Sequence, residues 1–188
     1  MEWGTRRQLM NLLGALALVA AVAGLAFGVP AIDRALPSQR PVRTDQPYSI
    51  GDGVTVLPPP GATIDLTGTR PGDDRGTVLF RLGPVSYTIA VQPFDGALAA
   101  AADRLRRRIT GTPGYQVTGS QFAVETAGGI AGLQGAYTAP GRGGRYTVFV
   151  VAGRAIEVTV SGAELDLGRW LPAIEASTRT LRYPGEQP

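Results

Sequence analysis

The chain has 188 residues, enough for one ordinary domain with its own core once the N-terminal segment is set aside. It contains no histidine, cysteine or lysine, so all 18 basic residues are arginines. These absences exclude imidazole bases, thiol nucleophiles, Schiff-base lysines, disulfides and zinc sites of the usual kind. The net charge of +3 suits the surface of an anionic membrane and does not call for nucleic acid.

Residues 9–29 form an apolar run that matches a transmembrane helix in length. A bilayer core about 30 Å thick needs roughly 20 apolar residues, whereas a signal-peptide core has about 7–15. A cleaved signal peptide after the basic pair Arg6 and Arg7 is the main alternative, and a buried helix of a soluble core would show a polar stripe. The run therefore favours a retained single-pass anchor, preceded by a short tail, residues 1–8. Gly24 and Gly28 stand one small-xxx-small step apart, a spacing that allows anchor helices to pair.

The segment after the anchor indicates where the soluble part begins and on which side it lies. Residues 30–46 are rich in proline and arginine and are predicted to be a spacer, followed by a soluble domain at 47–184 and a tail at 185–188. A short tail, a basic pair and an apolar run resemble the start of an export signal. We therefore expect a cell-membrane protein with an extracytoplasmic domain, although arginines stand on both sides of the run.

The soluble part begins with short strands and turns. A hairpin at 48–57 turns at 51–53, an extended piece follows at 63–66, and a polar turn occupies 69–76. Alternating apolar residues then predict two strands, 77–82 and 85–92.

The second half of the soluble part contains two predicted helices with strands between them. Asp95 is the expected cap of a helix at 98–109, whose apolar residues form one stripe. Period-two patterns predict four further strands, at 115–126, 130–139, 145–152 and 154–161. A closing helix follows, with Pro172 expected in its first turn, and then an extended tail at 181–183.

Short connections between successive strands imply antiparallel pairing. The order of elements therefore predicts an α+β domain, a twisted antiparallel sheet packed by two helices. In the last strand Ile156 and Val158 point one way and Glu157 and Thr159 the other, which predicts one covered and one less covered face.

Several motifs follow one another along the soluble part: Val56, Leu57, Pro58 and Gly61, the strand VSYTIAVQPF, the helix at 98–109, the meander at 128–162, and Trp170 with Ile174. In this order they resemble the PsbP-like fold family, found in a photosystem II subunit and in a yeast Ran-binding import factor. The likeness covers most of the soluble part and implies binding and assembly roles rather than catalysis, with no cofactor. Similar single-span actinobacterial proteins include accessory factors of envelope glycolipid export, and the arginine-only composition is typical of a high-GC bacterial genome.

Two clusters of charged residues are candidate sites. Arg104, Arg106, Arg107 and Arg108 are the densest charge in the chain, and they suit an anionic partner or a lipid headgroup as well as a solvated helix face. Asp73 and Asp74, with Asp52 or Asp65, are the carboxylates available for calcium or for hydrolysis, but Asp-Asp between glycines is more typical of a turn.

The sequence predicts a non-catalytic binding or accessory domain acting with a cell-envelope protein or lipid. The alternative is a sensor that binds a small molecule or lipid in a pocket between sheet and helix. A carboxylate-based hydrolase is a third hypothesis.

Overall fold

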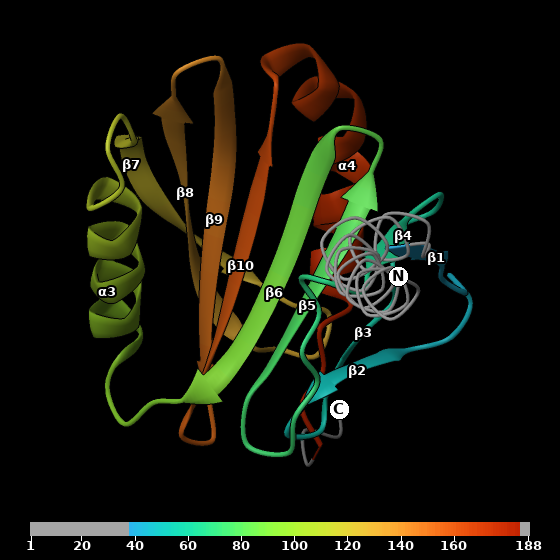
Figure 1. The fold of residues 1–188 in the computed structure, drawn as a ribbon. Helices are drawn as coiled ribbons and strands as arrows, with labels where there is room; N and C mark the ends of the chain where they lie inside the picture. The colour runs from blue at the N-terminus through green and yellow to red at the C-terminus, as the bar shows by residue number, and fades with distance from the viewer. Residues whose placement is uncertain (1–37, 185–188) are drawn as a thin grey trace, which may run out of the picture. The chain divides into compact units, whose positions relative to one another are not determined.

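The computed structural model describes residues 38–184 of the chain. The predicted anchor at 9–29, with Gly24 and Gly28, and the tail at 185–188 lie outside these residues. Within the described range no helix has the length and apolar character that crossing a membrane requires. The elements are β1 (Gln39–Pro41), β2 (Tyr48–Gly51), β3 (Val54–Val56), β4 (Thr63–Asp65), β5 (Gly76–Leu82), β6 (Val85–Pro93), α3 (Leu98–Thr110), β7 (Gln116–Glu125), β8 (Ala131–Ala139), β9 (Arg142–Val151), β10 (Arg154–Gly162) and α4 (Glu164–Arg179) (Figure 1).

One antiparallel sheet of eight strands organises the domain, in the order β1-β4-β5-β6-β10-β9-β8-β7. Strands β7 to β10 form the meander that the sequence predicts, and β2 pairs with β3 in a separate two-stranded sheet. The central pairing joins β6 to β10, where Ile89 lies opposite Val158. This long-range contact makes a continuous sheet from two groups of strands that are separated in sequence by α3 (Figure 1).

Two tight hairpin turns carry non-glycine residues with positive φ. Asp52 and Gly53 connect β2 to β3 with φ values of 51° and 74°, and Ala152 and Gly153 connect β9 to β10 with 45° and 74°. Consecutive positive φ values are typical of type I′ turns, whose twist matches that of the flanking strands. Arg154 donates from Nε to the Asp52 carboxylate, so an ion pair joins the β2–β3 turn to the start of β10.

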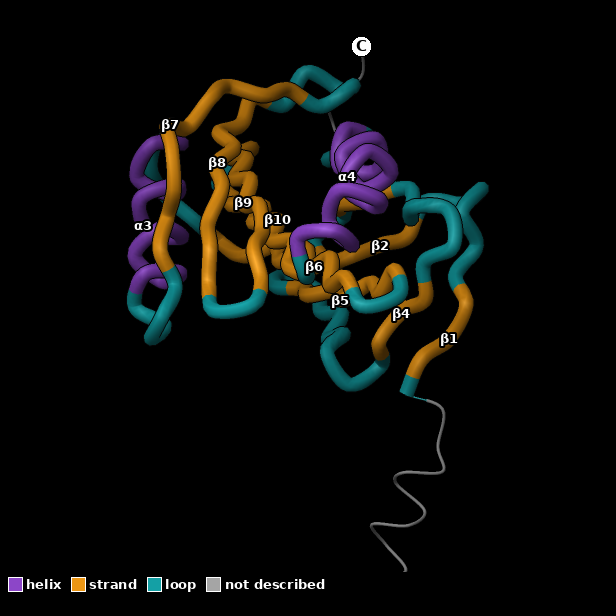
Figure 2. The backbone as a smooth tube through the Cα atoms, turned by 90° about the horizontal axis from the view of Figure 1, so that it is seen from above, coloured by secondary structure: helices purple, strands orange, loops and turns teal. Residues whose placement is uncertain are grey.

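The two helices cover opposite faces of the sheet (Figure 2). Helix α3 packs on the face formed by alternate residues of β8, β9 and β10, and α4 packs on the other face. Glu157 is only 3% exposed beneath α3, so the prediction of a less covered face is wrong at β10. The same face remains partly open over β5 and β6, at Thr77, Arg81, Ser86 and Gln92.

Three local expectations differ from the structure. Gln39–Pro41, placed in the predicted spacer, forms β1 and pairs with β4, where an edge strand tolerates proline. Helix α3 begins after Ala97, which makes no side-chain cap, so Asp95 does not cap it. Helix α4 begins at Glu164, so Pro172 lies inside the helix rather than in its first turn, because the apolar stripe begins later than the helix itself.

Candidate functional site

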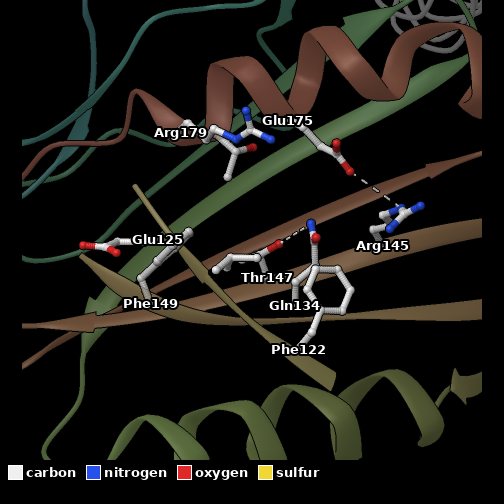
Figure 3. Close-up of a pocket in the computed structure, with 10 residues that line it drawn as sticks. Phe122, Glu125, Gln134, Arg145, Thr147, Phe149, Glu175 and Arg179 are labelled. Carbon is white, nitrogen blue, oxygen red and sulfur yellow. Dashed lines mark hydrogen bonds and ion pairs between the residues drawn. The ribbon is translucent and has the colours of Figure 1, made fainter. Parts of the chain in front are cut away.

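A pocket opens between the sheet and α4, as the alternative hypothesis from the sequence requires (Figure 3). Its volume is about 520 Å³, within the range of about 300–1,000 Å³ typical of ligand sites. The walls come from β7, β8 and β9 on one side and from α4 on the other. The lining residues are Phe122, Val124, Glu125, Gln134, Arg145, Thr147, Phe149, Glu175, Thr178 and Arg179.

A distortion of β7 creates the outer wall of this pocket. Thr118 pairs with Ala136 and Phe122 with Gln134, so residues 119–121 of β7 stand opposite Gly135 alone. Bulges of this kind bend a strand and change the direction of its side chains. Figure 2 shows β7 running beside α3 and then bending across toward the side of α4. Phe122, just after the bulge, consequently lines the pocket while 48% of its surface stays exposed.

The pocket combines apolar and charged side chains. Its floor contains the buried Phe149 and the buried Thr147, whose hydroxyl accepts a hydrogen bond of 3.1 Å from the Gln134 amide. At the rim Arg145 and Glu175 lie 3.9 Å apart, which makes a weak ion pair because both remain partly exposed (Figure 3). Such a lining suits a ligand with an apolar body and an ionised group.

Arg179 is the cation of the pocket that has no ionic partner among residues 38–184. Its side chain makes no ion pair in this range, whereas its backbone carbonyl accepts from the Ala127 N–H at 2.7 Å. That backbone contact holds the end of α4 against the turn after β7. The guanidinium is therefore available to a carboxylate or phosphate in the pocket.

A buried hydrogen-bond network fixes the helical wall. The Thr178 hydroxyl donates to the Ile174 carbonyl at 2.9 Å, so the Tyr87 hydroxyl, 3.0 Å away, donates to Thr178. Burial raises the pKa of Tyr87 to about 12, which keeps the phenol protonated as a donor. Tyr87 belongs to β6, and the network therefore ties α4 to the centre of the sheet.

The four arginines that the sequence singles out lie apart from this pocket. Arg104 and Arg108 both bind the buried carboxylate of Glu157, at 3.0 and 2.7 Å. Arg104 also lies over the Phe94 ring, 4.6 Å from its centroid. The structure thus gives two of the four an internal partner on β10, and the remaining two extend toward solvent.

Arg106 and Arg107 are exposed on α3. Arg106 pairs with Asp103 at 3.4 Å, an exposed contact of little energetic weight, and Arg107 makes no ion pair within the described residues. Contact of this helix face with an anionic partner stays a prediction.

The candidate carboxylates are separated into different local environments. Asp65 accepts hydrogen bonds from the Thr67 hydroxyl at 2.6 Å, from the Thr67 and Gly68 backbone, and from Arg81 at 3.2 Å. The Thr67 hydroxyl is the main reason that the pKa of Asp65 is lowered. Asp73 and Asp74 are exposed in the β4–β5 loop. Residues 38–184 contain no cluster of three acidic residues that could hold a metal ion.

The chain is similar to known proteins in its three-dimensional structure. No protein-family model matches the sequence, and no curated protein matches it. PsbP (CyanoP) from Synechocystis sp. PCC 6803 superimposes with a TM-score of 0.53 at 18% identity, covering 79% of this chain and 94% of that one. The described domain has a PsbP-like fold. The α+β, PsbP-like part of the predicted fold class is therefore confirmed, and the predicted transmembrane helix stays a prediction.

Two further solved structures are similar to the PsbP-like domain. PA94 of Pseudomonas aeruginosa, a protein of unknown function, aligns with a TM-score of 0.50 at 19% identity, covering 69% of this chain and 96% of that one. LpqN of Mycobacterium tuberculosis, involved in cell envelope biogenesis, reaches a TM-score of 0.40 at 15% identity, covering 76% of this chain and 88% of that one. The last likeness is too distant to support an inference.

A pocket between sheet and helix belonged to the alternative hypothesis from the sequence, which named none of the lining residues. One signal was present: Phe122 is a large apolar residue in a strand of mostly small and polar ones, three positions after Gly119. Gly119 has φ of 67°, as an irregular strand often requires. The contribution of α4 had no local signal, because its approach to β7 depends on the packing of the whole PsbP-like domain.

Proposed function

We propose that this protein is a membrane-anchored, extracytoplasmic and non-catalytic accessory domain of the cell envelope. In this proposal it binds an envelope lipid, or a partner that carries one, in the pocket between β7–β9 and α4. The observation that carries the proposal is the lining of that pocket, whose volume is about 520 Å³. It contains the half-exposed ring of Phe122 and the guanidinium of Arg179, which has no ionic partner within residues 38–184. An amphipathic molecule can place its apolar part against the Phe122 ring and its anionic group against the Arg179 guanidinium.

The location rests on the apolar run at 9–29, which is long enough to span a bilayer. An anchor confines the domain to the plane of the membrane and raises its effective concentration near lipids and membrane proteins. The non-catalytic part of the proposal rests on the absence of histidine, cysteine and lysine and on the hydrogen bonds that occupy Asp52 and Asp65.

The decisive test uses the full chain extracted from its native membrane in a mild detergent. We expect native mass spectrometry to detect a retained lipid and Phe122→Ala to reduce its occupancy about tenfold, the effect of losing roughly 1.4 kcal/mol of apolar contact. Leu66→Ala is the matched control, because Leu66 is 43% exposed and does not line the pocket. Absence of lipid from the wild type, or equal retention by both variants, would refute the proposal.

The side of the membrane is tested separately by protease treatment of intact spheroplasts. Degradation of the domain from outside is the expected result, and protection would overturn the extracytoplasmic location.

The same pocket also favours the alternative of a small-molecule or lipid sensor. A sensor releases and rebinds its ligand on dilution, whereas an accessory subunit keeps its lipid or partner through purification.

A further inference from the structure

A groove separate from the pocket at α4 lies at the start of β5 and the end of β6, beside α3, and three arginines are among its lining residues. Arg70 and Arg75 come from the β4–β5 loop and Arg108 from α3, with the polar side chains of Thr77 and Gln92 between them. The groove has a volume of about 520 Å³. We propose that it binds a phosphate or diphosphate group, carried either by a lipid headgroup or by a small soluble molecule.

The loop that carries two of the arginines is held in one conformation. Arg70 and Thr77 exchange two backbone hydrogen bonds, of 2.8 and 2.9 Å, which close the loop. A Cβ on Gly76 would lie 1.8 Å from the Ile50 carbonyl oxygen, and one on Gly72 would lie 2.3 Å from that of Arg75. These contacts allow only glycine at both positions. A fixed backbone lowers the entropy that a ligand must overcome when it orders the site.

Two of the three arginines of this groove form no ion pair within the part of the chain that the structure describes. Within residues 38–184, Arg70 and Arg75 have no carboxylate within 4.0 Å, and Arg108 uses one nitrogen for Glu157. Asp73 and Asp74 belong to the same loop but do not line the groove. Glu157, the partner of Arg108, does not line the groove and is already shared with Arg104.

The chemistry of the lining favours phosphate over a simple carboxylate. Three guanidinium groups supply several planar pairs of N–H donors, which match the tetrahedral oxygens of phosphate. Thr77 and Gln92 add neutral donors between the charges. One carboxylate has too few oxygens and too little charge to engage all of these groups, whereas a diphosphate can.

The test uses the full chain in neutral detergent micelles, so that the anchor stays covered, and calorimetric titration with three probes. Inorganic pyrophosphate represents a soluble phosphate, dihexanoyl phosphatidylglycerol an anionic headgroup, and dihexanoyl phosphatidylcholine a zwitterionic one. We expect saturable binding of at least one of the first two and at least tenfold weaker binding of phosphatidylcholine. Pyrophosphate binding identifies a soluble source, and binding of phosphatidylglycerol alone identifies a headgroup.

Variants decide whether the binding belongs to this groove. Arg70→Gln and Arg75→Gln should each weaken it about tenfold, the effect of losing one charge-assisted contact. Arg142→Gln is the matched control, because Arg142 is an exposed arginine that lines neither this groove nor the pocket at α4. Absence of saturable binding overturns the proposal, and so does an equal loss in Arg142→Gln. The lipid retention that tests the pocket at α4 is independent of both outcomes.

Discussion

Replacement of Glu157 by glutamine tests how the sheet and α3 are joined. Glu157 lies on β10, is 3% exposed, and accepts hydrogen bonds from Arg104 at 3.0 Å and from Arg108 at 2.7 Å. Glu157→Gln keeps the shape of the side chain but removes its negative charge. Arg104 of α3 then remains against the sheet without its counter-charge, and its Nε atom is already buried without a hydrogen-bond partner in the described residues.

The expected loss follows from how deeply the three charges are buried. Loss of one partner from a fully buried pair costs about 3–5 kcal/mol. Here the side chains of Arg104 and Arg108 are 32% and 56% exposed, so water can solvate part of each released guanidinium. The glutamine carbonyl also keeps one acceptor. We therefore expect Glu157→Gln to lower the free energy of unfolding by about 2–3 kcal/mol, below the fully buried range.

The measurement is urea unfolding of the full chain in detergent, followed by far-ultraviolet circular dichroism. Asp103→Asn is the control, because it removes the exposed pair with Arg106 on the same helix and should change stability by less than about 0.5 kcal/mol. A loss below about 0.5 kcal/mol for Glu157→Gln would show that the buried carboxylate does not hold α3 on the sheet, contrary to this reasoning.

Three further predictions follow from glycine contacts and pKa shifts. Gly76→Ala should destabilise the domain by about 2 kcal/mol or more in the same urea assay, because the new Cβ would collide with the Ile50 backbone. Gly168→Ala, in open space on α4, should instead stabilise the domain by about 0.5–1 kcal/mol. Equal effects of the two substitutions would contradict this prediction. The pKa of Asp65 is lowered in the folded state, so its ionised carboxylate contributes stability that is fully present above the unfolded-state pKa of about 3.9. This contribution is lost as the pH falls through the folded-state pKa. Asp65→Asn should therefore flatten the decline of the free energy of unfolding at acid pH. Absorbance of phenolate at alkaline pH should show Tyr87 titrating last, near its pKa of about 12, and Tyr87→Phe should remove that step.

Local pattern was sufficient for the longer strands and for α3, but not for β1 or for all of the helix ends. The period-two runs identified β5 to β10, and the single apolar stripe identified α3, because strand and helix each repeat at a fixed spacing. The helix starts were less predictable. Ala97 rather than Asp95 precedes α3, and α4 begins well before Pro172, since capping depends on how the chain enters each helix.

The sequence by itself determined the kind of fold, the strand pairings that adjacent hairpins make, the apolar run at 9–29 and the lack of imidazole, thiol and lysine chemistry. Each of these depends on composition or on residues close together in the chain. Tertiary structure alone decided that β6 lies against β10, that Glu157 is buried beneath two arginines of α3, and that Phe122 faces α4 across a pocket. These contacts join segments far apart in sequence, and their geometry follows from sheet twist, the bulge in β7 and helix packing, none of which a local pattern specifies.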